Sequence, residues 1–261
     1  MDFGLTGKTA LVLGGGGGLG RAIAKALARE GANVAVAGIG AASIDATLAE
    51  LKDIGGKTLG LIWDLADLSV IDANVTKIES ELGPVDILIN NTGGPPPTTA
   101  TSVDPALWAK QFHAMVLSVI AIADRVLPGM KARGWGRILT STSSGVVSPI
   151  PNLAISNALR LSLVGWSKTL AREVGKDGVT ANIIVPGRIA TARVAALDNA
   201  KAKREGRSAE EVAAESQATI PLGRYGKPEE YADVVAFLAS RRAAYITGSV
   251  IRVDGGMITS I

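Results

Sequence analysis

The chain has 261 residues, of which 27 are basic and 24 are acidic, with one histidine and no cysteine. The lack of cysteine excludes disulfides, a thiolate nucleophile and a cysteine metal site, and one histidine excludes a zinc site built on two. A net charge of +3, spread along the chain, is too weak to indicate a nucleic-acid partner. A hydrophobic fraction of 47% is typical of a folded domain.

Short apolar runs that are typical of buried strands alternate with helical stretches along most of the chain. We expect strands over residues 8–13, 33–37, 57–62, 85–89, 137–141, 179–185 and 249–253. We expect helices over residues 20–30, 43–53, 68–82, 105–133, 152–176 and 229–240. Because helical crossovers join parallel strands, this order predicts an α/β fold, a Rossmann-type doubly wound parallel sheet of about seven strands with helices on both faces.

The pattern predicts a single domain over residues 1–261, with a small helical lid inserted at about 188–221. The first part of this insertion, residues 188–207, has six basic and two acidic side chains, a net charge of +4. A solvated helical flap explains this charge, and a lid that meets an anionic substrate is the alternative. No signal peptide is evident, and the apolar run 115–123 is shorter than the roughly 20 residues of a bilayer span. We therefore expect a cytoplasmic protein with no membrane partner.

A run of glycines follows the first predicted strand. Residues 14–18 are all glycine, and Leu19 and Gly20 come next, where a helix is expected to begin. Glycine lets the backbone turn sharply and approach a ligand, and such a turn directs peptide N–H groups and the positive end of a helix at a diphosphate. The run predicts a dinucleotide-binding (Rossmann-like) domain, and a tight structural turn is the alternative.

The order of motifs resembles the short-chain dehydrogenase/reductase family and is closest to its bacterial 3-oxoacyl-carrier-protein reductase branch. The glycine run is similar to the family's TGxxxGxG, with leucine in place of threonine, and other family motifs are matched at residues 87–93 (ILINNTG), 186–191 (PGRIAT), 245–248 (YITG) and 253–256 (VDGG). This resemblance implies an NAD(P)-dependent oxidoreductase that moves a hydride between a nicotinamide and a small-molecule carbonyl or alcohol. It also implies a homotetramer or homodimer.

The resemblance assigns the cofactor contacts to residues at the carboxyl ends of several strands. These are Gly14, Gly18, Leu19 and Gly20 at the pyrophosphate, Asp64 and Leu65 at the adenine, Asn91 and Gly93 along the ribose, and Pro186, Gly187, Ile189 and Thr191 near the nicotinamide. Residues 38–40, at the end of the second strand, hold neither an acidic residue for the ribose hydroxyls nor an arginine for a 2′-phosphate. Because no carboxylate there repels a 2′-phosphate, NADP is slightly preferred, and NAD stays open.

The family's active-site residues are mostly replaced. The tyrosine and lysine of its YxxxK motif fall on Ser156 and Arg160, its asparagine falls on Met115, and its serine is retained as Ser143. A serine hydroxyl is a far weaker acid than a tyrosine, and an arginine hardly moves protons because it stays cationic. Ser143, Ser156 and Arg160 are thus the candidate residues of an atypical active site. We expect Pro95, Pro96 and Pro97 to form a wall of this pocket.

Each of these candidates has an ordinary structural alternative. Ser143 could be a strand-end hydroxyl bonded to backbone, and Arg160 could form a salt bridge on its helix. His113, two residues from Met115, is expected on the outer side of its helix, and the tyrosines at 225, 231 and 245 are not expected to reach the pocket.

Three functions follow from this pattern. The first is a carbonyl or 3-oxoacyl reductase with an atypical site. The second is a cofactor-binding protein without turnover, such as a degenerate reductase or partner subunit. The third is non-redox chemistry on a carboxylate held by Arg160.

Overall fold

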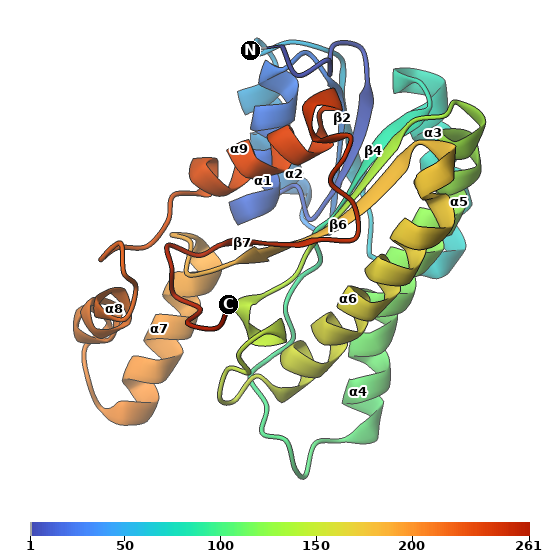
Figure 1. Cartoon of the computed structure of the whole chain (residues 1–261). Helices are drawn as coiled ribbons and strands as arrows, with labels where there is room; N and C mark the ends of the chain where they lie inside the picture. The colour runs from blue at the N-terminus through green and yellow to red at the C-terminus, as the bar shows by residue number, and fades with distance from the viewer. Residues whose placement is uncertain (1) are drawn as a thin grey trace.

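A computed structural model describes residues 2–261 and has one sheet of seven parallel strands in the order β3-β2-β1-β4-β5-β6-β7 (Figure 1). The strands are β1 (Thr9–Leu13), β2 (Asn33–Gly38), β3 (Thr58–Ile62), β4 (Val85–Asn90), β5 (Gly136–Ser141), β6 (Val179–Pro186) and β7 (Val250–Val253). The predicted doubly wound sheet is confirmed. Strand order reverses direction between β1 and β4, and such a reversal leaves a crevice at the carboxyl ends of the strands.

Helices cover both faces of the sheet. They are α1 (Gly18–Arg29), α2 (Ala41–Leu51), α3 (Ile71–Leu82), α4 (Pro105–Phe112), α5 (Ser118–Ala132), α6 (Ala154–Val174), α7 (Ala192–Glu205), α8 (Ala209–Ala218) and α9 (Pro228–Ala239). In Figure 1, α1, α2 and α9 lie on one face, and α3, α5 and α6 lie on the other. All the predicted strands and helices are present, with ends that differ by one to two residues at most sites.

The two cores on either side of the sheet follow from the alternation of side chains along each strand. In β1, Ala10 and Val12 belong to the core formed with α1 and α9, whereas Leu11 and Leu13 belong to the core formed with α3, α5 and α6. All four are fully buried. Because successive residues of a strand point to opposite faces, a strand covered on both sides is apolar throughout.

The predicted long helix over 105–133 is interrupted by a π-helical turn. Residues His113–Leu117 form this turn between α4 and α5, and Met115 lies buried within it. The helical segment Pro105–Ala132 contains an 18-residue stretch with a mean hydropathy of 1.5, so by length and composition alone it could cross a membrane. However, its Val119, Ile122 and Val126 are buried in the cores, so the segment packs as a helix of the domain.

Helices α7 and α8 occupy the predicted insertion between β6 and α9, and ion pairs join them. Lys201 Nζ lies 3.3 Å from a carboxylate oxygen of Glu215, and Arg207 Nη1 lies 2.5 Å from the other oxygen. Much of the positive charge in this segment is therefore balanced within the helix pair.

Gly20 packs so closely against the glycine loop that a side chain would not fit at this position. A Cβ on Gly20 would lie 2.1 Å from the carbonyl oxygen of Gly14, whereas a Cβ on Gly17 would have no neighbouring atom within 4 Å. We expect Gly20→Ala to lower the free energy of unfolding by about 3 kcal/mol, because backbone must move to relieve the contact. Gly17→Ala is the matched control, with an expected change below about 1 kcal/mol. Urea unfolding followed by far-UV circular dichroism measures both, and equal effects would contradict this account.

Candidate functional site

A cavity of about 780 Å³ opens where the carboxyl ends of β1, β4, β5 and β6 meet. The segments that line it are 17–19, 91–94, 141–144, 147–151, 186–189, 191–194 and 257–260, together with Leu153, Ser156, Arg160 and Leu197. This is the edge of an open parallel sheet at which ligands bind.

The glycine loop forms one side of the cavity. Gly14 and Gly18 have positive φ angles of 61° and 44°, which glycine adopts readily. Asn91, at the end of β4, donates its side-chain N–H to the carbonyl of Leu13 at 3.3 Å and so ties β4 to the loop. Gly17 is the N-cap of α1 and provides no side-chain cap, so the first N–H groups of the helix stay available to a ligand.

The cavity brings together eight of the twelve residues expected to contact a cofactor. These are Gly18, Leu19, Asn91, Gly93, Pro186, Gly187, Ile189 and Thr191. Gly14 and Gly20 lie behind the loop, in contact with each other. Asp64 and Leu65 lie outside the cavity, just after β3.

Both candidate serines line the cavity. Ser143 is the N-cap of a 3₁₀ helix, Ser144–Val146, and its Oγ accepts a hydrogen bond from the N–H of Gly145 at 3.1 Å. The hydroxyl proton of Ser143 is free for another acceptor, because Oγ is the acceptor in this bond. Ser156 lies in the first turn of α6 and is 7% exposed.

Arg160 forms part of the cavity wall and binds backbone carbonyls instead of a carboxylate. It is 7% exposed and donates from Nη1 to Ser141 O at 3.4 Å and from Nη2 to Thr92 O and Gly93 O at 3.3 and 3.0 Å. The alternative of a salt bridge on its helix is therefore wrong. Burial, together with the nearby charge of Arg193, lowers the pKa of Arg160 to about 10, so it remains a cation at neutral pH.

Met115 does not reach the cavity. It packs with Val116, Ile155 and Leu159 in a small apolar core between the α4–α5 segment and α6. His113, in the same turn, is exposed, as expected for the outer side of the helix.

The predicted proline wall is wrong. Pro95 is buried outside the cavity lining, and Pro96 and Pro97 are exposed. A second proline pair, Pro149 and Pro151, lines the cavity instead. The loop after β4 crosses to the start of α6, where Thr98 pairs with Leu153, and this path carries residues 95–97 past the cavity.

A buried tyrosine lies behind the wall, although none was expected near the pocket. Tyr231 of α9 is fully buried and donates its hydroxyl to Ser141 Oγ at 2.8 Å. Burial raises the pKa of Tyr231, so this phenol stays protonated. Because Ser141 lines the cavity and accepts this bond, its own hydroxyl proton can point to a further acceptor.

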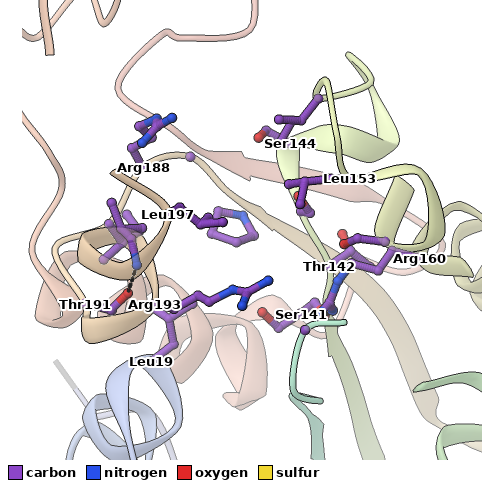
Figure 2. Close-up of a pocket in the computed structure, with 18 of the residues that line it drawn as sticks. Leu19, Ser141, Thr142, Ser144, Leu153, Arg160, Arg188, Thr191, Arg193 and Leu197 are labelled. Atoms are coloured by element: carbon purple, nitrogen blue, oxygen red, sulfur yellow. Dashed lines mark hydrogen bonds between the residues drawn. The ribbon is translucent and has the colours of Figure 1, made fainter. Parts of the chain in front are cut away.

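Two arginines from the insertion at residues 188–221 also line the cavity (Figure 2). Arg188 pairs with Asp198 of α7 at 2.5 Å, and Tyr225 donates its hydroxyl to the same carboxylate at 2.7 Å. Arg193 donates from Nη2 to the carbonyl of Pro95 at 2.9 Å. The predicted positive charge of residues 188–207 is the sequence signal that pointed to these side chains.

Comparison with known proteins identifies the family of the chain. The family described as "Enoyl-(Acyl carrier protein) reductase" matches residues 15–258. The chain is 37% identical to the 3-oxoacyl-(acyl-carrier-protein) reductase FabG of Escherichia coli K12, over 98% of this chain and 99% of that protein. It is 35% identical to nodulation protein G of Azospirillum brasilense, over 96% and 98% of the two chains.

Among solved structures, the fold is similar to L-sorbose reductase from Gluconobacter frateurii in complex with NADPH and L-sorbose. The TM-score is 0.94 and the identity 33%, with all of both chains covered. The sheet, the glycine loop and the cavity define a dinucleotide-binding α/β protein. The chain belongs to the short-chain dehydrogenase/reductase family of oxidoreductases.

Tyr231→Phe tests the polar contact behind the cavity. The variant removes the donor to Ser141 Oγ in a buried site, so the free energy of unfolding should fall by about 1 kcal/mol. Tyr245→Phe is the matched control, because Tyr245 is fully exposed and its hydroxyl should not affect stability. Thermal unfolding measures both, and a stability of Tyr231→Phe equal to the control's would show that the hydrogen bond contributes nothing.

Proposed function

We propose that this protein is an NADP-dependent carbonyl reductase, similar to 3-oxoacyl reductases, with an atypical active site. The observation that carries the proposal is the cavity itself, where the glycine loop, the end of β4, the end of β5 and the turn after β6 converge. Relatives that are reductases cover nearly the whole chain, and the solved L-sorbose reductase binds NADPH.

The residues at the cavity fit a nicotinamide dinucleotide. Gly17 lines the cavity and has no atom within 4 Å of the position of a Cβ, so a side chain there would occupy space that a ligand could fill. Thr92 carries a buried Oγ1 without a hydrogen-bond partner in residues 2–261. The peptide N–H groups of 18–20 would hold the pyrophosphate, Asn91 and Gly93 the ribose, and residues 186–191 the nicotinamide. Asp64 and Leu65 would meet the adenine at the end of β3. When bound, the cofactor supplies the hydride.

The end of β2 supports NADP over NAD. Ile39 is 76% exposed there, between Gly38 and Gly40, so no carboxylate stands where a 2′-phosphate would bind. Arg21 donates to the carbonyl of Gly16 at 3.0 Å, but it also pairs with Glu50 at 3.1 Å, so its charge is already balanced and the preference rests on the missing carboxylate.

The side chains at the cavity can orient a carbonyl, but none of Ser143, Ser156 and Arg160 is a good general acid that could donate a proton to the substrate. The hydroxyl of Ser143 can donate to a substrate oxygen, and Ser156 stands where the family has its tyrosine. Arg160 adds a fixed positive charge, but all three of its bonds go to backbone. General acid–base help is typically worth ~10²–10⁴-fold, so its loss slows hydride transfer without preventing it.

Binding of cofactor without turnover is the second candidate function, and the replaced tyrosine and lysine favour it. Non-redox chemistry on a carboxylate at Arg160 is less well supported, because both terminal nitrogens of this arginine already donate to carbonyls. In either candidate, we propose that residues 188–221 act as a lid over the cavity and that the protein works in the cytoplasm.

Titration calorimetry with NADPH and NADH tests the proposal directly. We expect both to bind, with NADPH the tighter, because the end of β2 holds no carboxylate. Tighter binding of NADH would reverse the cofactor preference, and absence of binding by either would overturn the proposed function.

Reversion of the replaced pair tests the atypical site. Ser156→Tyr combined with Arg160→Lys should raise turnover of ketones and oxoacyl thioesters by ~10²–10⁴-fold, because it restores a tyrosine whose pKa a neighbouring lysine lowers. Stopped-flow oxidation of NADPH measures the rate. An unchanged rate in a folded variant that binds NADPH would mean that the wild-type site already has an efficient proton donor.

We also propose a homotetramer or homodimer, with α4, α5 and α6 between subunits. Leu161 of α6 is 52% exposed and Phe112 of α4 is 38% exposed, whereas Ala123 is buried in the core and is excluded from such an interface. Leu161→Glu should dissociate the oligomer in analytical ultracentrifugation, because it places a charge on this apolar face. Leu222→Glu, at another exposed leucine, is the control. A wild-type protein that sediments as a monomer would rule out the assembly.

A further inference from the structure

The cavity presents three cations and no anion. Arg160, Arg188 and Arg193 line it, and no Asp or Glu among residues 2–261 does. The three guanidinium groups differ in what they already contact, and this difference identifies the one that a ligand can use.

Two of the three are already committed to other groups. Arg188 forms an ion pair with Asp198, a carboxylate that is 4% exposed, so its charge is balanced from outside the cavity. Arg160 donates from both terminal nitrogens to backbone carbonyls, so it is a structural part of the cavity wall.

Arg193 is the cation left for a ligand. Its one hydrogen bond goes to the carbonyl of Pro95, and it forms no ion pair with any carboxylate of residues 2–261. Figure 2 shows its side chain reaching from the start of α7 toward Ser141 and Arg160. A guanidinium carries five N–H donors in a planar fork, so most of the fork is unused. The charge of Arg193 also lowers the pKa of Arg160, and a bound anion would relieve this repulsion.

The lining of the cavity also contains apolar side chains. Among them are Val147, Ile150, Leu153 and Leu197. A single free guanidinium in a cavity with apolar side chains in its lining matches a ligand with one negative charge and an apolar body, whereas a phosphate monoester would bring nearly two charges.

We propose that the substrate is an organic acid, with its carboxylate on Arg193 and its apolar part against Val147, Ile150, Leu153 and Leu197. This substrate class rests on the proposed function for the chemistry that follows binding. The residues next to the sheet then orient the reacting carbonyl, and Arg193 holds the far end of the molecule.

Titration calorimetry with hexanoate, hexanamide and hexyl phosphate, each with and without saturating NADPH, tests the proposal. Hexanoate should bind at least about tenfold more tightly than hexanamide, because a charge-assisted pair replaces a neutral contact. Equal affinity of the acid and the amide would overturn the proposal, and so would tighter binding of hexyl phosphate.

Two variants separate the roles of substrate and cofactor. Arg193→Met should remove the preference for the acid, at a loss of about tenfold in hexanoate affinity, and leave hexanamide and NADPH affinities unchanged. Arg204→Met, on the same helix but outside the cavity, should behave as wild type. A loss of NADPH affinity in Arg193→Met without a change for hexanoate would make this arginine a cofactor contact and overturn the proposal.

The same measurements distinguish the two proposals. If NADPH binds and the acid is not preferred, only the substrate class fails. If hexanoate is preferred and NADPH does not bind, the reductase function fails and the acid site stands.

Discussion

The contact between Gly20 and the carbonyl of Gly14 is the constraint on which the site depends. It lets the first turn of α1 pack directly on the loop after β1, so the helix begins at the edge of the sheet with its N–H groups toward the cavity. Gly187 has a similar role on the far side, where a Cβ would lie 2.5 Å from Cα of Asp254. Both sides of the cavity are thus backbone packed on backbone, which gives a ligand access to peptide groups that side chains would otherwise cover.

Arg160 is a buried cation that forms part of the cavity wall. A buried cation is costly to desolvate, and here three carbonyl dipoles stabilise it in place of a carboxylate. These bonds join α6 to the end of β5 and to the segment after β4, so they hold Arg160 in the cavity wall. Next to it, the hydroxyl of Ser141 accepts a hydrogen bond from Tyr231, which lies behind the wall.

The basic side chains of the insertion at residues 188–221 divide into two groups. Those of Lys201 and Arg207 pair with Glu215 between α7 and α8, which agrees with a solvated flap. Arg193 is different because it lines the cavity and has no acidic partner in residues 2–261. A solvated flap therefore explains Lys201 and Arg207, whereas Arg193 is the residue that supports an anionic ligand.

The alternation of apolar runs and helical stretches by itself determined the sheet, its two covered faces and the edge at which the cavity lies. Local patterns carry this information because the spacing of apolar residues along a strand or a helix indicates which side chains are buried. The glycine run was located by its place between the first predicted strand and helix, whereas Ser143, Ser156 and Arg160 were located by the resemblance to the family's motifs.

Only the tertiary structure decided what surrounds these residues. Tyr231 meets Ser141 across 90 positions of sequence, and Pro149 and Pro151 take the place expected for Pro95–Pro97. The partners of Arg160 and Arg193 likewise come from other segments. Such contacts depend on strand register and on the paths of loops between elements, and neither leaves a periodic signal in the sequence.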